Sequence, residues 1–304
     1  MTALMGLAAL ALQSMFCAQP ASANPQECAA LSTQYEQGKA TLGDIELNNL
    51  VFSAADKGCL ELTRQVLDAG GSVVMRARSG DTALHHAAAS GEIEIAKLLV
   101  ERGADINQRD LRGSTPLFLA AENSQPELVK MLLDLKADAS IEGRTDVTPL
   151  AAAVFNGNDE IVDLLLTHGT DPKLVDRTGK AAVVYAAARG FTGLVERMLK
   201  AGVDVNAVYG NDLTVLMWAA GYGEDVPEDD GLKTVTLLLD KGAKLDLLDN
   251  RGYTALMTAA DLGHEAVVKL LMARGANLTL KSKDGKTAAD FAQDNALKAL
   301  LTAK

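Results

Sequence analysis

Apolar residues recur along the chain with a period of 33 residues. The positions that mark this period are Leu84, Leu117, Leu150, Val183 and Leu216. The next equivalent, Leu256, comes 40 residues after Leu216, and Ala289 follows 33 residues later. A period of this length is typical of a solenoid in which each repeat is a small unit stacked on its neighbours.

Each unit carries signals for two short helices. A hydroxyl that can cap the start of the first helix is supplied by Thr82, Thr115, Thr148, Thr214, Thr254 and Thr287. Pairs of Ala then allow neighbouring helices to approach closely, and pairs of Leu fill the layer between repeats. Gly follows the helices in most units, but Ser124 and Lys136 replace it in one, where we expect local strain or a looser turn. The pattern predicts an all-α fold.

The repeated sequences resemble a known family. Stretches such as GDTALHHAAASGEIEIAKLLVERGADIN (80–107) and GSTPLFLAAENSQPELVKMLLDLKADAS (113–140) are similar to the ankyrin repeat pattern GxTPLHxAAxxGxxxxVxxLLxxGADVN. The resemblance covers residues 44–304. It implies an all-α ankyrin-repeat solenoid of stacked helix-turn-helix units with projecting β-hairpin loops.

The register of the repeats predicts the organisation of the chain. A degenerate first repeat at 44–76 precedes full repeats at 77–109, 110–142, 143–175, 176–208, 209–248 and 249–281, and a C-terminal cap at 282–304. Residues 24–43 predict an N-terminal capping helix, because Asn24 suits the N-cap and Pro25 the first helical position. Such caps cover the ends of a solenoid.

The repeat at 209–248 contains an acidic insertion at 224–230, within the stretch GYGEDVPEDDG. The register places it between the two helices of its repeat, where extra residues can loop into solvent at small closure cost. A calcium-binding EF-hand frame does not fit, because setting Gly231 at the invariant Gly puts Val226 and Leu237 at ligand positions. Two interpretations stay open: a solvated loop, or a contact with a basic partner.

Residues 1–23, MTALMGLAALALQSMFCAQPASA, carry no charged side chain and end in an Ala-x-Ala sequence. These features predict a secretory signal peptide cleaved before Asn24, although no Lys or Arg precedes its apolar core. The apolar run is short for a membrane span, so we expect no stable membrane insertion after cleavage. The signal peptide itself predicts a location in the periplasm. A lipoprotein signal at Cys17 fits less well, because the bulky Phe16 precedes it.

Cleavage of this segment would leave two cysteines, Cys28 and Cys59. In an oxidising compartment they can form a disulfide that closes a loop of about 30 residues and stabilises the fold by roughly 3 to 4 kcal/mol. Two buried free thiols are the alternative, because the repeat register does not by itself place Cys28 near Cys59.

Charge and motifs narrow the function classes. The chain has 40 acidic and 29 basic residues, and a formal charge of −11 that would repel a nucleic-acid backbone. No GxSxG, HExxH, Walker A or paired CxxC motif occurs. The repeat accounts for three of the four His, and His86 fits a packing role better than a metal-ligand role. We expect no catalytic residue, metal or cofactor.

The resemblance implies a protein partner on the concave surface, held by hairpin tips and the ends of the first helices. Carrying these positions over predicts partner contacts from Arg112, Arg144, Phe155, Asn156, Arg177, Arg189, Leu213, Tyr222, Arg251 and Tyr253. Arg and aromatic residues are enriched at binding hot spots. Tyr185 and Trp218, one turn earlier on their helices, are expected to pack between helices.

These features favour a monomeric, non-enzymatic protein-interaction module in the periplasm. Resemblance to secreted ankyrin proteins of Gram-negative bacteria that support a periplasmic catalase implies a role in oxidative-stress defence. The alternative is an exported effector or scaffold that acts on a host or rival-cell protein. A hydrolase or metal enzyme built on the acidic loop is a third hypothesis, from a different class.

Overall fold

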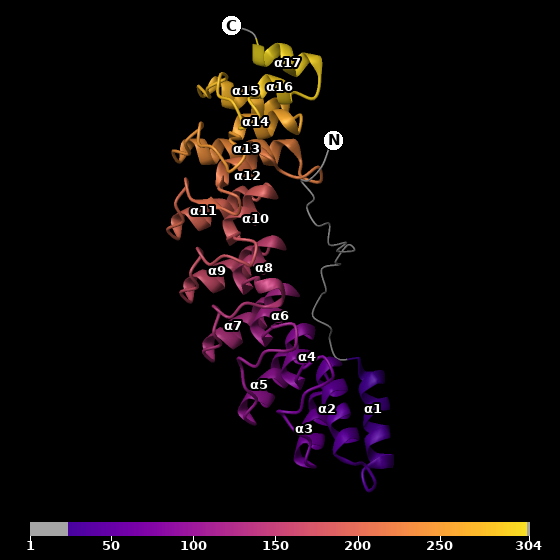
Figure 1. The fold of residues 1–304 in the computed structure, drawn as a ribbon. Helices are drawn as coiled ribbons and strands as arrows, with labels where there is room; N and C mark the ends of the chain where they lie inside the picture. The colour runs from indigo at the N-terminus through magenta and orange to yellow at the C-terminus, as the bar shows by residue number, and fades with distance from the viewer. Residues whose placement is uncertain (1–23, 303–304) are drawn as a thin grey trace.

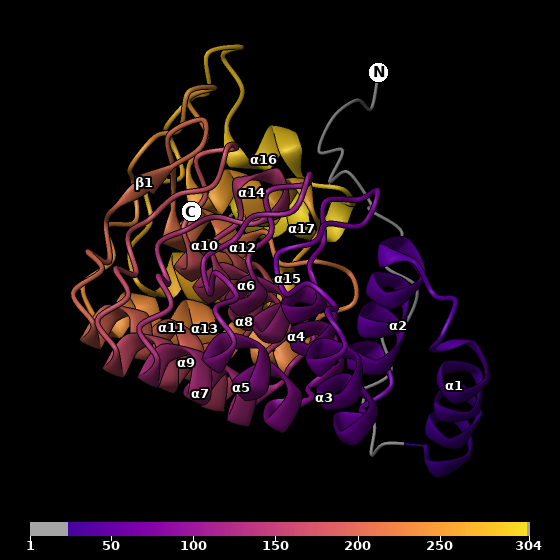
Figure 2. The same cartoon turned by 90° about the horizontal axis from the view of Figure 1, so that it is seen from below.

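The computed structural model describes residues 24–302, so the predicted signal peptide at 1–23 lies outside the described residues. Pairs of helices stack into an elongated solenoid that runs from α1 to α17 (Figure 1). Seen along the stack, the loops that join successive pairs project to one side, away from the row of second helices (Figure 2). The predicted all-α ankyrin solenoid is therefore confirmed.

The helices form two rows, with α1 (Pro25–Gly38) ahead of both. The first helices of the pairs are α2 (Asp44–Asp56), α4 (Ala83–Ser90), α6 (Pro116–Glu122), α8 (Pro149–Phe155), α10 (Ala182–Ala188), α12 (Val215–Ala220), α14 (Ala255–Asp261) and α16 (Ala288–Phe291). The second helices are α3 (Leu60–Asp68), α5 (Ile93–Glu101), α7 (Pro126–Asp134), α9 (Asp159–Thr167), α11 (Thr192–Lys200), α13 (Glu228–Asp240), α15 (Glu265–Ala273) and α17 (Asn295–Thr302). The projecting loops include the 3-10 turn η1 (Arg144–Asp146) and the hairpin of β1 (Val208–Tyr209) and β2 (Leu213–Thr214).

The predicted Thr caps start the first helices. The Thr115 hydroxyl accepts a hydrogen bond from the Phe118 backbone N–H at 3.1 Å, and the Thr148, Thr214 and Thr254 hydroxyls make the equivalent bonds. Each such cap stabilises a helix by about 1 kcal/mol. Helix α10 lacks one, because Ala181 stands at its N-cap.

Paired small residues hold the first helices together. The Ala pairs of α4, α6, α10, α12 and α14 are fully buried, and one continuous apolar core extends from Tyr35 to Leu301. Where Gly is replaced, Ser124 and Lys136 adopt left-handed φ angles of 56° and 68°. Such a conformation costs a non-Gly residue about 1 kcal/mol or more, so the expected strain at these two turns is confirmed.

The hairpin tips repeat one turn and touch their neighbours. The Asp110 N–H donates to the Ser114 carbonyl at 2.9 Å, and the equivalent bond closes the tips at Asp176 and Asp249. Successive tips are joined by backbone bonds such as Gly210 N–H to the Gly179 carbonyl, at 3.0 Å. In the sheet, Val208 pairs with Thr214 and Tyr209 with Leu213, antiparallel.

The acidic insertion is more ordered than a solvated loop. Helix α13 begins at Glu228 and has 13 residues, against nine in α11 and α15, so the last three of the seven inserted residues are helical. Pro227 precedes this helix, and three acidic residues occupy its first turn, where the helix dipole favours them. The remaining loop packs back on the preceding repeat, because Val226 is buried against Gly190.

Gly223 does not act as the ordinary inter-helix Gly that the register predicts. Gly157, Gly190 and Gly263 have φ angles between 68° and 74° at that place, whereas Gly223 has no positive φ. Its N–H instead donates to the Ala188 carbonyl at 3.3 Å, which ties the start of the insertion to the end of α10.

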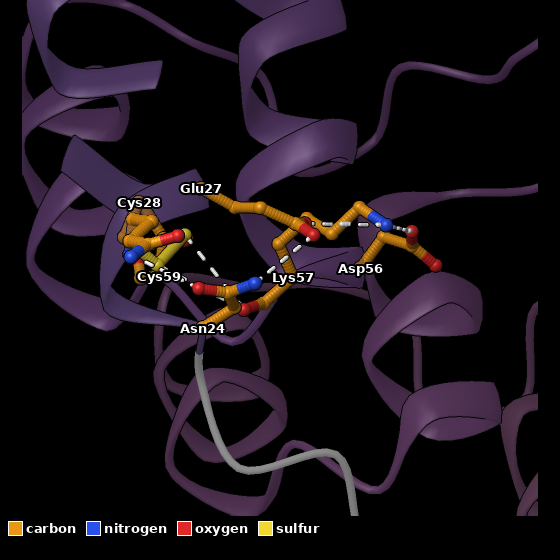
Figure 3. Close-up of a disulfide and its surroundings, with 8 residues drawn as sticks. Asn24, Glu27, Cys28, Asp56, Lys57 and Cys59 are labelled. Atoms are coloured by element: carbon orange, nitrogen blue, oxygen red, sulfur yellow. Dashed lines mark hydrogen bonds and ion pairs between the residues drawn. A yellow bond between two sulfur atoms is a disulfide. The ribbon is translucent and has the colours of Figure 1, made fainter. Parts of the chain in front are cut away.

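A pair of cysteines joins the cap helix to the first repeat (Figure 3). The structure places the sulfur atoms of Cys28 and Cys59 at bonding distance, with Cα atoms 5.3 Å apart. Beside them, Lys57 Nζ lies 3.4 Å from the Glu27 carboxylate. Helix α1 buries Tyr35, and its Cys28 and Leu31 side chains pack partly buried against the core.

We predict that this link stabilises the mature protein. The double variant Cys28→Ser/Cys59→Ser should lower the free energy of unfolding by about 3 kcal/mol, because the cross-link closes a loop of about 30 residues in the unfolded chain. Urea unfolding measures this change. Thiol titration of the unfolded, unreduced mature chain should find no thiol, and two titratable thiols there would contradict the prediction.

A second prediction concerns the ring of Tyr222, which lies directly over Gly231. A Cβ at residue 231 would lie 2.4 Å from the Tyr222 ring. Gly231→Ala should therefore destabilise the protein by about 1 to 3 kcal/mol through overpacking. Tyr222→Ala should cost about 3 kcal/mol through the cavity that it leaves. The double variant should cost less than the sum of the two, because removing the ring also removes the clash.

The matched control for this cycle is Gly193→Ala. Gly193 also lies in a second helix, but a Cβ there would come no closer than 3.9 Å to its nearest neighbour. This variant should be neutral or stabilising by up to about 1 kcal/mol, because Ala is the better helix former. Additive effects of Tyr222→Ala and Gly231→Ala in chemical denaturation would show that the ring does not rest on Gly231.

Candidate functional site

Most of the predicted basic contact residues at the tips already have acidic partners within the chain. Arg112 pairs with Asp110, Arg144 with Glu122, Arg177 with Asp146 and Arg251 with Asp249, over distances of up to 3.9 Å. The Asp110 and Asp249 carboxylates are buried and also accept backbone N–H groups of their own tips. These arginines therefore brace the tips, and their charges are largely offset.

Tyr222 and Leu213 were predicted to contact a partner from the surface. Both side chains are instead buried. Tyr222 is 7% exposed, and its ring is stacked on His264 at 3.9 Å between centroids. Burial raises the pKa of its hydroxyl. Leu213 is also 7% exposed and pairs with Tyr209 inside the hairpin. Both side chains belong to the core, because the insertion folds over Tyr222 and the hairpin over Leu213.

Tyr253 is half-buried and already has contacts on two sides. The Arg251 guanidinium lies 4.1 Å from its ring centroid, and the Phe291 ring lies 4.6 Å away. These contacts link the last full repeat to the C-terminal cap. Tyr253 therefore has a packing role, whether or not it also contacts a partner.

Phe155, Asn156 and Arg189 do come together, at the ends of α8 and α10. Phe155 is 37% exposed, and the Arg189 guanidinium lies 4.8 Å from the centroid of its ring. The same guanidinium lies 5.3 Å from the ring of Phe191. The Asn156 amide donates to the Glu122 carbonyl at 2.7 Å, so its side chain is fixed across two repeats.

The contact continues into the next repeat through residues that were expected to pack between helices. Tyr185 meets Phe155 edge-on, with ring centroids 6.0 Å apart. The Lys180 ammonium, from the hairpin tip, lies 6.0 Å from the Tyr185 centroid and 5.2 Å from the Trp218 centroid. All three side chains are half-buried. We call the set formed by Phe191, Arg189, Phe155, Tyr185, Lys180 and Trp218 the aromatic–cation row.

Asp176 fixes the middle of this row. The Tyr185 hydroxyl donates a hydrogen bond to the Asp176 carboxylate, which also accepts from the Thr178 hydroxyl and the Thr178 and Lys180 backbone N–H groups. Burial alone would raise the pKa of Asp176, but these bonds outweigh it and lower the pKa. Burial, followed by the bond to Asp176, raises the pKa of Tyr185. The ring is therefore held as a neutral phenol against a charged carboxylate.

Sequence reasoning placed Phe155, Asn156 and Arg189 correctly at helix ends, and Lys180 at a tip, but missed Tyr185 and Trp218 as their neighbours. The available signal was the period itself. Tyr185 and Trp218 are 33 residues apart, each two places after the marker positions Val183 and Leu216. In a stack, equivalent residues of successive repeats lie side by side, so two such rings were bound to share one face.

The four His side chains have structural contacts. His85 Nδ1 accepts from the Thr82 N–H, its Nε2 lies 3.1 Å from the Ser114 carbonyl, and burial lowers its pKa. His168 and His264 hydrogen-bond backbone carbonyls, and His86 packs beside Phe52. Within residues 24–302, no group of three or more His, Cys, Asp or Glu side chains is placed to hold a metal ion. In the same range, no helix has the length and apolar character needed to cross a membrane.

Comparisons with known proteins agree with the architecture. The family model described as ankyrin repeats (3 copies) matches overlapping stretches at 15–110, 51–143, 108–176, 150–228, 183–282 and 226–304. Ankyrin repeat and SAM domain-containing protein 6 of Rattus norvegicus is 40% identical over 85 residues, which are 28% of this chain and 9% of that protein. E3 ubiquitin-protein ligase hecd-1 of Caenorhabditis elegans is 39% identical over 25% of this chain and 3% of its own length.

A further relative is an ankyrin repeat-containing protein of Schizosaccharomyces pombe, 33% identical over 20% of this chain and 30% of that protein. The chain thus spans less than a third of each of these relatives, and the likeness concerns the repeats alone. Ankyrin repeats indicate a protein–protein interaction module. The family match, together with the 33-residue period and the stacked helix pairs, shows that this chain belongs to the ankyrin-repeat family.

Proposed function

We propose that the protein is a monomeric, non-enzymatic module that binds a protein partner on the aromatic–cation row. The observation that carries this proposal is the row itself: four aromatic rings and two cations from successive repeats, in contact and half-exposed. Aromatic and Arg side chains dominate the binding energy of protein interfaces. Solenoids characteristically bind proteins on extended surfaces of this kind.

The row has the rigidity that a binding surface needs. Tyr185 is fixed by Asp176, Arg189 by the rings of Phe155 and Phe191, and the first helices beneath them by buried Ala pairs. A surface that is ordered before binding loses less side-chain entropy when the partner docks. This arrangement favours specific recognition over loose adhesion.

The proposed location is the periplasm. It is supported by the apolar, uncharged residues 1–23 with their Ala-x-Ala ending, and by the cysteine pair, since disulfides persist in oxidising compartments. We extend the proposal to oxidative-stress defence beside a catalase, on the resemblance to secreted bacterial ankyrin proteins. An exported effector or scaffold acting on a host or rival-cell protein is the alternative, distinguished by where the mature chain accumulates.

We predict that Phe155→Ala and Trp218→Ala each weaken capture of the partner from a periplasmic extract by about tenfold or more, as expected for hot-spot rings. Catalase is the partner to be looked for in the captured fraction. The matched control is Leu135→Ala, because Leu135 is also an exposed apolar residue, 45% accessible, but lies at the end of the second helix α7. Circular dichroism checks that each variant is folded.

The proposal fails if both row variants bind every partner as tightly as the unaltered chain does. If Leu135→Ala loses binding instead, the interface lies on the second helices. In either case the aromatic–cation row would have only a structural role.

We also predict that the mature chain begins at Asn24. Expression in a Gram-negative host, followed by osmotic shock and mass spectrometry, should recover a periplasmic protein that lacks residues 1–23. Recovery of an intact chain from the cytoplasm would contradict the periplasmic proposal. Accumulation in the culture medium would favour the effector alternative.

A further inference from the structure

The two cations of the aromatic–cation row, Lys180 and Arg189, have no acidic partner among the described residues, unlike the arginines at the tips. Arg112, Arg177 and Arg251 form ion pairs, whereas neither Lys180 nor Arg189 lies within 4.0 Å of a carboxylate among the described residues. Both face aromatic rings instead. Ring contacts leave the hydrogen-bond donors of a cation without an acceptor, so the charge stays available to a ligand.

Two buried donors at the row also lack an acceptor. The Arg189 Nε and the Trp218 Nε1 are buried and have no hydrogen-bond partner among the described residues. An unsatisfied buried donor is unfavourable, and such groups are rare in folded proteins. Neighbouring side chains cover both atoms, so an outside ligand reaches them only when those side chains move. A carboxylate is the side-chain group that only accepts, and it suits a surface with surplus donors.

Two acidic residues close to the row, Asp176 and Glu122, already have partners within the chain. Asp176 accepts from Tyr185 and Thr178, and Glu122 pairs with Arg144. Burial raises the pKa of Glu122 and outweighs the opposing effect of Arg144. Neither carboxylate can turn to Arg189 without giving up its present partners. The acidic insertion also approaches this end of α10, where Asp230 packs against Gly190, but the Asp230 carboxylate pairs with Lys233. Among the described residues no carboxylate lies within 4.0 Å of either cation, so both remain open to an acceptor from another molecule.

From this arrangement we infer that the partner segment bound on the row is acidic. It presents a carboxylate to Arg189 and Lys180 and an apolar side chain to the rings of Phe155 and Trp218. Arg and carboxylate groups form strong, charge-assisted bonds, which are stronger still where aromatic rings exclude water. This inference rests on the proposed function and adds the chemistry of the partner.

An acidic partner is not what the net charge of the whole chain suggests. A formal charge of −11 and the acidic start of α13 would attract a basic partner at long range. We expect the row itself to select the opposite sign, because its two charged members, Lys180 and Arg189, are cations with no ion pair among the described residues. An experiment on the intact surface can therefore distinguish the two.

The test uses the full mature chain and a displayed library of random short peptides as the probe. Selected peptides should be enriched in Asp or Glu beside an aromatic or large aliphatic residue. Replacing their carboxyls by amides, with Asn for Asp and Gln for Glu, should weaken binding about tenfold or more, the equivalent of one charge-assisted bond. Fluorescence anisotropy of labelled peptides gives the Kd.

Variants of the protein assign the effect to the row. Arg189→Gln and Lys180→Gln should each raise the Kd of a selected acidic peptide by about tenfold, and Arg189→Lys should restore part of the loss. Arg102→Gln is the control, since this residue at the end of the second helix α5 already pairs with Asp68 at 2.8 Å and is not among the predicted contacts. It should change the Kd by less than about twofold. Lys180→Gln keeps the test decisive if Arg189→Gln does not fold.

Selection of basic or uncharged peptides, or of no peptide at all, would overturn the inference, as would equal Kd values for Lys180→Gln and the control. The proposed function is tested separately by Phe155→Ala. Loss of partner binding in Phe155→Ala without any effect of the Lys180 and Arg189 variants would refute the acidic partner alone. Full binding by all of these variants would refute the interface as well.

Discussion

The close packing of first helices through paired Ala side chains is the constraint on which the rest of the structure depends. Ala186 and Ala187 of α10 are fully buried, as are Ala219 and Ala220 of α12. Without larger side chains between them, successive helices lie in direct contact and in fixed register. Equivalent residues of neighbouring repeats therefore become spatial neighbours, although they are 33 positions apart in the sequence.

This register creates the candidate site. It places the rings of Tyr185 and Trp218 on adjacent helices, within reach of the single Lys180 ammonium, and brings Phe155 beneath Arg189. The tip contributes as well, since Asp176 both closes its hairpin and fixes the Tyr185 hydroxyl. Three of its rings lie on first helices and the fourth, Phe191, at the start of α11, so the packed stack fixes where each ring stands.

Local chemistry explains why much of the fold was predictable. The Thr caps, the buried Ala pairs and the strained turns at Ser124 and Lys136 follow from residue type and position within one repeat. The insertion defeated the same reasoning, although Pro227 with acidic residues after it was a readable helix start. Tyr222 was misplaced because its burial depends on Gly231 and His264, contacts that no local pattern reveals.

The most direct test of the binding surface uses Trp218, the single tryptophan of the chain. Its emission reports on the aromatic–cation row alone when the bound peptide or partner segment carries no tryptophan. A partner that docks on the row should, at saturation, shift this emission and protect it from acrylamide quenching. Unchanged emission and unchanged quenching at saturation would show that the partner binds elsewhere on the solenoid.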